Sequence, residues 1–390
     1  MNLYPDTDNF TSIMPFDTAI MENTLLHWIL KMATDLRKNC HTFLSGNHEL
    51  SPAELFAQMA EWCENNSADH DSYGEGETIQ QFEQKLATLL GFESALFVIT
   101  GTMTQATVLE MACQEKHCHN VALHDTSHIT RHEGQGFQLQ NRFNVLPVGD
   151  RYRPWNVEDL KQWPDNIAAA VYELPMRELG GQLPSWQELE QVKRYCHQHG
   201  IHLHMDGARL WEAGPYYNKA YSEITQGFDS VYVSLYKGVN GLGGSVLLGD
   251  SALIEKARMW MRRQGGNVYH RTPYVVAAAM QFDERIARIE ELFERTEHVY
   301  QIFHDYPDFT LNPAAPQSNM FHWYLPVSVE KANVLRDKLA QTKGIWLGHP
   351  QNAPQPDQCF IEWYVGDRLL DMPDHDLIDL LEWVNDYVHA

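Results

Sequence analysis

The sequence predicts an α/β fold, in which a large domain built on a mixed, mostly parallel sheet precedes a smaller C-terminal α+β domain. Three observations support this prediction. Short apolar runs typical of buried strands alternate with helical patterns up to Gly249. Long helical patterns follow that glycine, and residues 308–390 return to isolated strand and helix patterns. The 390 residues are 44% hydrophobic and 21% charged, which is enough apolar material for a sizeable core.

The first helices are predicted from apolar periodicity and start signals. Ser51 is a favourable N-cap, Pro52 would occupy the first helical position, and Glu54 follows three residues after the cap. Helices are predicted over 21–37, 51–65, 78–90, 103–113 and 186–199. We interpret residues 1–36 as an N-terminal extension.

The predicted strands of the large domain are short and apolar, as expected for strands buried on both faces. They cover residues 94–100, 121–124, 168–174, 201–206, 230–235 and 244–248. In parallel sheets ligands bind beyond the carboxyl ends of the strands. Polar residues at these ends are therefore the candidates for chemistry.

The small domain is predicted from the remaining pattern. Long helices are expected over 251–263 and 275–303. After them come strands 320–325 and 360–365, a helix at 329–341 and a final helix from residue 375. The boundary between the domains is expected near 270–305.

The charge balance limits the classes of partner. The chain has 29 Lys and Arg against 52 Asp and Glu, a formal net charge of −23. We therefore expect no binding to nucleic acid or to an anionic membrane, and any anionic ligand needs a local cationic site. No apolar run is long enough to span a membrane, the N-terminus lacks the basic residues of a signal peptide, and six cysteines form no CxxC pair. These features predict a cytoplasmic protein.

Four polar features fall at predicted strand ends. Gly101 and Thr102 open a helix and could cradle a phosphate, or could simply form a turn and a cap. Lys237 leaves a buried strand into a glycine-rich loop, where a Schiff base would remove the cost of an unpaired ammonium. The ordinary alternative is a solvated loop lysine. The other two features are histidine clusters, listed as His124, His128 and His132, and His202, His204 and Asp206.

Several motifs together resemble the threonine aldolase group of enzymes that use pyridoxal 5'-phosphate (PLP). DGARL at 206–210 is followed by Lys237 in SLYKGVNGLGG, and the resemblance extends to YGEGET at 73–78, ALFVITGTM at 95–103 and SHI at 127–129. It covers roughly residues 37–390. It implies the PLP-dependent transferase-like fold (fold type I) with a seven-stranded sheet. The implied domains are a large PLP-binding domain, 37–270, and a small domain with its connecting helix, 271–390.

The resemblance assigns cofactor contacts residue by residue. Lys237 would form the Schiff base, and Asp206 would pair with the pyridine nitrogen and keep it protonated. Arg209 would lie near the phenolic oxygen or the substrate, and His128 would lie over the ring and take part in proton transfer.

The same resemblance assigns the phosphate and substrate contacts. Gly101 and Thr102 would hold the phosphate, and Arg271 would reach it from a neighbouring subunit. Ser45 lies where the family has a serine that touches the substrate carboxylate. The implied assembly is a homodimer or homotetramer with shared active sites.

Two departures from the family pattern affect the substrate. The family's carboxylate-binding arginine aligns with Glu362, whose charge would repel a carboxylate. The family's histidine after Glu173 is absent. Arg177 is the candidate for the missing positive charge. We expect threonine to be a poor substrate, and Glu362→Arg to improve its cleavage.

The favoured function is a PLP-dependent lyase that cleaves a β-hydroxy-α-amino acid to glycine and an aldehyde. A PLP-dependent β-eliminating lyase or an aminotransferase is the first alternative, and a non-catalytic PLP carrier is another. A zinc-dependent hydrolase is a third, since His202, His204 and Asp206 share one strand face. Metal-like spacing also occurs at Cys113, His117, Cys118 and His119, but we interpret it as a chance arrangement of surface residues at the end of a helix.

Overall fold

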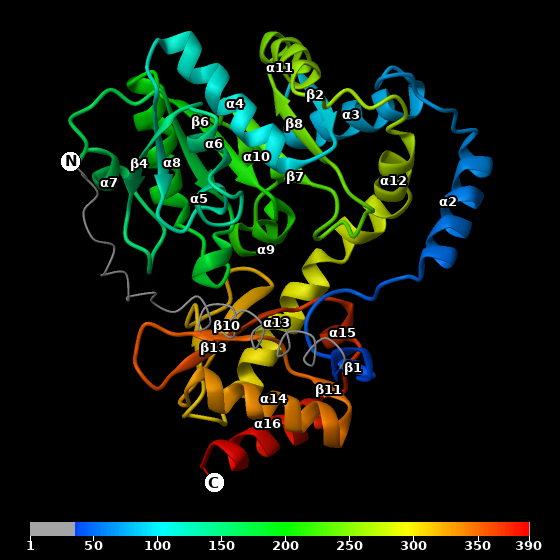
Figure 1. Ribbon diagram of the computed structural model, residues 1–390, viewed down its shortest axis with the longest axis vertical. Helices are drawn as coiled ribbons and strands as arrows, with labels where there is room; N and C mark the ends of the chain where they lie inside the picture. The colour runs from blue at the N-terminus through cyan, green and yellow to red at the C-terminus, as the bar shows by residue number, and fades with distance from the viewer. Residues whose placement is uncertain (1–35, 390) are drawn as a thin grey trace, which may run out of the picture.

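The computed structural model describes residues 36–389. Two bodies lie one above the other, and helix α13 (Ile289–Phe303) runs between them (Figure 1). The predicted helix 21–37 lies almost entirely outside the described residues. Among those residues, no helix combines the length and the apolar character needed to cross a membrane.

A seven-stranded sheet forms the centre of the large domain, in the order β2-β8-β7-β6-β5-β3-β4. Its strands are β2 Ser94–Val98, β3 Asn120–His124, β4 Asn144–Val148, β5 Ala169–Glu173, β6 His202–Gly207, β7 Ser230–Ser234 and β8 Ser245–Gly249. Strand β8 is antiparallel to both of its neighbours, and the other pairs are parallel. The predicted mixed, mostly parallel sheet is confirmed. Strand β4 was not predicted, because Pro147 interrupts its apolar pattern. A proline is tolerated there because β4 is at the edge of the sheet.

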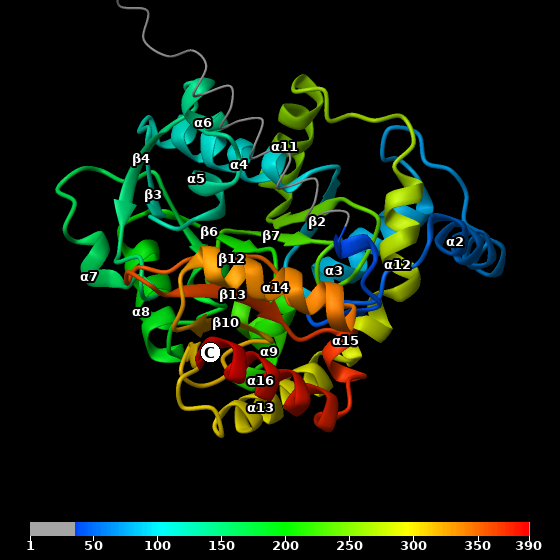
Figure 2. The same ribbon diagram turned by 60° about the horizontal axis from the view of Figure 1, so that its bottom comes forward.

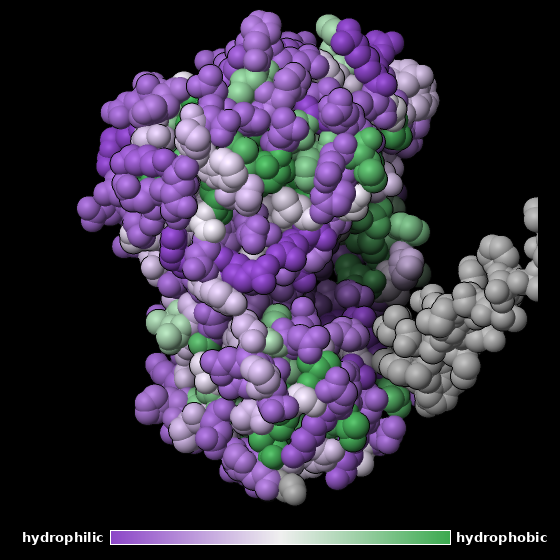
Figure 3. Space-filling model, turned by 60° about the vertical axis from the view of Figure 1, so that its left-hand side comes forward, coloured by the Kyte–Doolittle hydropathy of each residue, from purple (hydrophilic) through white to green (hydrophobic). Residues whose placement is uncertain are grey.

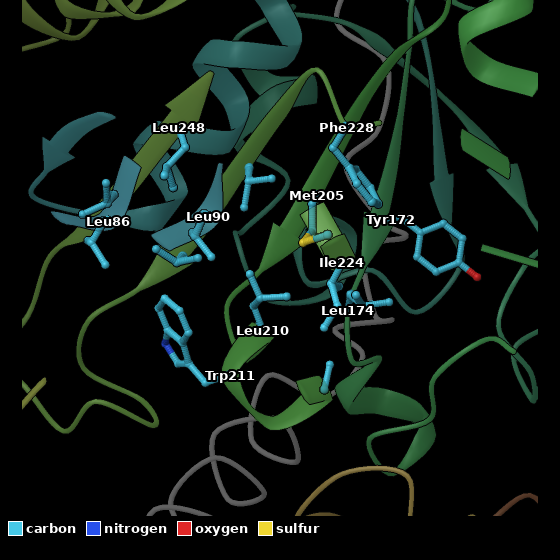
Figure 4. Close-up of a cluster of buried hydrophobic side chains, with 14 of the residues drawn as sticks. Leu86, Leu90, Tyr172, Leu174, Met205, Leu210, Trp211, Ile224, Phe228 and Leu248 are labelled. Atoms are coloured by element: carbon cyan, nitrogen blue, oxygen red, sulfur yellow. The ribbon is translucent and has the colours of Figure 1, made fainter. Parts of the chain in front are cut away.

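Both faces of this sheet are buried, because successive side chains point to opposite sides. Ala95 and Phe97 join one core cluster, whereas Leu96 and Val98 join another. The first face is covered by α3 (Glu77–Leu90), α8 (Trp186–Gln198), α10 (Tyr221–Thr225) and α12 (Thr272–Ala287). The second face is covered by α4 (Gly101–Lys116) and α11 (Ser251–Arg263). Figure 4 shows the first core, where side chains of α3 meet those of the strands and of the segment after β6.

The predicted helix starts are confirmed where a cap signal marks them. Helix α2 (Pro52–Asn66) begins with a capping box between Ser51 and Glu54. Short helical turns fill the connections, at α5 His128–Arg131, α6 Gly136–Leu139, α7 Val157–Leu160, η1 Arg177–Leu179, η2 Leu210–Ala213, α9 Gly214–Tyr217 and α15 Asp367–Leu370.

The small domain is a four-stranded antiparallel sheet covered by helices. Its order is β12-β13-β10-β9, with β9 Thr310–Asn312, β10 Met320–Leu325, β12 Pro350–Asn352 and β13 Cys359–Tyr364. Helices α14 (Val329–Lys343) and α16 (Asp374–His389) cover the face that lies away from the large domain (Figures 1 and 2). Ile361 and Trp363 of β13 pack beneath these helices, so Glu362 and Tyr364 point the other way, toward the large domain.

Two predicted boundaries are corrected. The single helix expected over 275–303 is two helices, α12 and α13, that meet at Arg288. The start of the described chain belongs to the small domain, because β1 (Thr42–Phe43) pairs with β11 (Ile345–Trp346) and Leu44 joins the small-domain core. The large domain therefore does not begin at residue 37.

Candidate active site

Lys237 lies just beyond the end of β7 and is half-buried. Within residues 36–389 its ammonium forms no hydrogen bond or ion pair, and its nearest ring contact is Tyr236 at 5.8 Å. Burial, and secondarily the charge of Arg209, lowers its pKa. A partly desolvated amine with no partner is what a Schiff-base lysine requires.

Asp206 lies at the end of the neighbouring strand β6 and is 2% exposed. One carboxylate oxygen accepts from Gln105 Nε2 at 2.9 Å, and the other accepts from the Ala208 N–H at 3.1 Å. Each oxygen keeps acceptor capacity, so this buried carboxylate fits the role of partner to a protonated pyridine nitrogen. The sequence reasoning missed Gln105, although its position one helical turn after Gly101 places both on one face of α4.

The N-terminus of α4 lies at the same edge of the sheet. Thr100 is its N-cap and accepts from the Met103 N–H at 3.3 Å, so the capping interpretation of this turn is correct. Gly101 packs against the hydroxyl of Tyr232, which leaves no space for a side chain there. Thr102 lines a hollow of about 410 Å³ together with Thr100 and Gln264. The assignment of Gly101 and Thr102 to a phosphate stays a prediction.

Arg271, at the N-terminus of α12, is buried within this chain. It is 6% exposed, and its guanidinium donates to the Phe97 carbonyl at 3.4 Å and to Asn267 Oδ1 at 2.6 Å. The contact of Arg271 with the phosphate of a neighbouring subunit stays a prediction.

His128 starts the short helix α5, and a buried carboxylate, Glu173, positions it. Glu173 accepts from the His128 N–H at 3.2 Å and from the Arg177 N–H at 3.0 Å. Burial, and secondarily the charge of Asp206, raises the pKa of Glu173 to about 7. The imidazole is partly exposed, with Nδ1 3.3 Å from Glu133 Oε1.

Arg177 is not a free cation for substrate. Its Nε lies 2.9 Å from one oxygen of Glu362 and 3.2 Å from the other, and its Nη2 lies 3.0 Å from Glu362 Oε1. Glu362 and Arg177, the candidate for the missing positive charge, thus neutralise each other across the domain boundary. This pairing removes the basis for expecting Arg177 to bind the substrate carboxylate.

Ser45 connects the start of the chain to the small domain. Its hydroxyl accepts from the Tyr364 N–H at 2.9 Å and donates to the Tyr364 carbonyl at 3.3 Å. The hydroxyl proton is therefore engaged by backbone, so the predicted contact with a substrate carboxylate is not supported by this geometry.

A cavity of about 320 Å³ lies beside Lys237, where both domains contribute its walls. Arg209 lines it from the large domain and Tyr364 and Arg368 from the small domain. Figure 3 shows that hydrophilic residues predominate along the boundary between the two bodies. Glu212 and Arg368, which also line this cavity, were not identified from the sequence, because their proximity depends on how the domains pack.

The metal-site alternative finds no support in the geometry. Within residues 36–389, no group of three or more His, Cys, Asp and Glu side chains could hold a metal ion. His202 and His204 face the α4 side of the sheet with Asp206, as predicted, but both rings lie against Ser230 Oγ, at 2.8 and 2.7 Å. Burial lowers the pKa of His204 to about 3, so its ring stays neutral.

Comparison with known proteins relates this chain to one group of enzymes. The family model described as beta-eliminating lyase matches residues 53–324. The low specificity L-threonine aldolase of Saccharomyces cerevisiae is 30% identical over 249 residues, and the matched region spans 60% of this chain and 60% of the yeast enzyme.

Solved structures extend the comparison to nearly the whole chain. A Listeria monocytogenes protein proposed to be an L-allo-threonine aldolase is 34% identical, with a TM-score of 0.83 over 92% of this chain and 99% of that one. Serine palmitoyltransferase from S. paucimobilis, solved with bound PLP, is 16% identical with a TM-score of 0.65, over 88% of this chain and 86% of that one. This last likeness concerns the fold alone.

Proposed function

Because the chain belongs to the beta-eliminating lyase family, a family of PLP-dependent lyases, we propose that it cleaves a β-hydroxy-α-amino acid to glycine and an aldehyde. The observation that carries the proposal is the unpaired ammonium of Lys237 next to the strand that ends in buried Asp206. A carboxylate and an amine at adjacent strand ends are the two groups that PLP chemistry requires of a protein.

In this proposal each residue has a separate task. Lys237 would hold the cofactor through its side-chain amine. Asp206 keeps the pyridine nitrogen protonated, and Gln105 and the Ala208 N–H fix the position of its carboxylate. Bound PLP supplies a sink for the electron pair of the breaking Cα–Cβ bond. The N-terminus of α4 and Thr102 supply donors for the phosphate.

His128 is the proposed base for the substrate hydroxyl. In the tautomer that donates from Nδ1 to Glu133, Nε2 carries the free lone pair. Nε2 would accept the hydroxyl proton as the Cα–Cβ bond breaks and the aldehyde forms. The protonated imidazole would then supply the proton that Cα needs to become glycine. Glu173 holds the His128 backbone, which keeps the imidazole in place.

A β-eliminating lyase is the second candidate, favoured by the description of the matching family. Elimination from threonine would release a 2-oxo acid and ammonia, whereas aldol cleavage releases glycine and acetaldehyde. Product analysis separates the two directly.

The first prediction concerns Lys237. Borohydride reduction of the holoenzyme should fix the cofactor on Lys237 in the peptide map. Lys237→Ala should abolish turnover, because no other amine occupies this strand end. Lys219→Ala is the control, since that surface lysine pairs with Glu223 and should behave as wild type. A label on any other lysine would overturn the assignment.

We also propose that the chain acts as a homodimer or homotetramer on a small amino acid, in the cytoplasm. The six cysteines, all free, support a reducing compartment. Support for assembly comes from two exposed aromatic side chains that contact each other, Tyr73 and Tyr269, each 53% exposed.

A further inference from the structure

The cavity beside Lys237 has an uncompensated positive charge. It is lined by Lys237 and by three arginines, Arg37, Arg209 and Arg368. Within residues 36–389, none of the four forms an ion pair with an acidic side chain. In a chain with a net charge of −23, such a cavity is a local exception that favours an anionic ligand.

The acidic residues of the cavity do not cancel this charge. Glu49 is exposed at the rim, and Glu212 is buried with its pKa raised to about 7, first by burial. At neutral pH much of Glu212 is therefore uncharged. Asp367, which precedes Arg368, is paired elsewhere, because Arg285 Nη1 lies 2.7 Å from it and Arg288 Nη1 lies 3.1 Å from it.

Arg368 is the small-domain cation best placed for a ligand. One of its nitrogens, Nη1, donates to the Ser45 carbonyl at 3.2 Å. The guanidinium lies over the Phe43 ring at 4.7 Å, which orients the group, and its backbone N–H donates to the Gly46 carbonyl. The remaining N–H groups have no partner among the described residues. A planar guanidinium with free donors matches the geometry of a carboxylate.

We propose that Arg368 binds the α-carboxylate of the amino acid substrate. This proposal rests on the proposed function. It also explains how the chain tolerates Glu362, since Glu362 is neutralised by Arg177 while a cation six residues later in the chain faces the cavity. The carboxylate site has moved from the strand β13 to the start of α15.

The test measures ligand binding by the visible absorbance of the holoenzyme. Glycine carries an amine and a carboxylate, and methylamine carries only the amine. Arg368→Gln should weaken glycine binding at least tenfold and leave methylamine binding unchanged. Arg368→Lys keeps the positive charge but loses the two parallel N–H donors of the guanidinium. It should weaken glycine binding by a smaller factor. Arg37→Gln removes the same charge from the exposed rim of the cavity and should change glycine binding less than threefold.

The outcomes separate this inference from the proposed function. If wild type responds to glycine and both Arg368 variants bind glycine equally well, the assignment of Arg368 is wrong. An equal loss of glycine and methylamine binding would also overturn it, because the defect would not concern the carboxylate. If wild type holding PLP responds to no amino acid, the proposed function itself fails. Retained cofactor absorbance in each variant confirms that it folds.

Discussion

At the scale of single residues, Glu212 is an unusual feature of the site. It is 3% exposed, and its Oε2 is buried without a hydrogen-bond partner in the part of the chain that the structure describes. A Cβ placed on Gly238 would lie 2.7 Å from its Oε1, so the carboxyl group lies directly against the backbone that follows Lys237. Burial raises its pKa to about 7, against the opposing charges of Arg209 and Lys237. A buried carboxyl group of this kind makes the stability of the folded protein depend on pH.

The direction in which stability changes with pH follows from the linkage between proton binding and folding. The pKa of Glu212 rises from 4.5 to about 7 on folding, so the folded state holds its proton more tightly. Stability is therefore full below pH 4.5 for this group and is lost as the pH rises to about 7. Glu212→Gln should remove this loss and raise the stability at pH 8 by on the order of 3 kcal/mol relative to wild type.

Thermal unfolding of both proteins at pH 5 and pH 8 measures this difference. Glu49→Gln is the matched control, because that carboxylate is exposed and lines the same cavity. Identical pH profiles for wild type and Glu212→Gln would show that the carboxyl group is ionised without cost in the folded protein.

At the scale of elements, the ion pair between Arg177 of η1 and Glu362 of β13 decides the role of Glu362. The period of two along β13 places Glu362 on the face toward the large domain, where Arg177 meets it. The side chains of Arg177 and Glu362 are 30% and 21% exposed, so solvent weakens the pair only in part. The pair therefore connects the two domains.

This geometry reverses the expectation for Glu362→Arg. The substitution would place two guanidinium groups together, and we expect a loss of about 2 kcal/mol in stability and no gain in threonine cleavage. The double exchange Arg177→Glu with Glu362→Arg should recover most of the stability. Thermal unfolding and steady-state kinetics measure both effects. A single variant that is more active and as stable as wild type would show that the pair does not join the domains.

The same elements show how far the sequence alone could reach. Strand 360–365 and its alternation were predictable, but the face that meets the large domain was not, because that depends on packing between distant segments. Lys237 and Asp206 were found because a motif places them at strand ends. Arg368 was not, since only the path of the chain from β1 brings Ser45 and Phe43 beside it. No glycine or proline lies at the break between α12 and α13, so the sequence contains no signal that predicts this break.

At the scale of the whole molecule, an exposed apolar surface predicts assembly. Tyr73 and Tyr269 contact each other with ring centroids 5.1 Å apart, and Val268, next to Tyr269 in the chain, is 40% exposed. Clusters of this kind on a single chain mark interaction sites. We expect light scattering to give at least twice the mass of the 45.0 kDa chain.

The variant Tyr269→Asp should shift the population toward monomers, because a charge would then have to be buried in the interface. The exposed Tyr152, 58% accessible and in a separate loop, provides the control as Tyr152→Asp. A wild-type monomer with full cofactor occupancy would contradict the proposed assembly.

The pairing of β1 with β11 sets an order of events during synthesis. Strand β11 emerges from the ribosome about 300 residues after β1. At roughly 5–20 residues per second, the first strand waits on the order of 15–60 s for its partner. During that interval the strands of the large domain can pair with one another. The segment that contains Phe43 and Ser45 has to remain without its partner strand. Translation therefore completes the wall of the cavity last, after the lysine and its sheet are already in place.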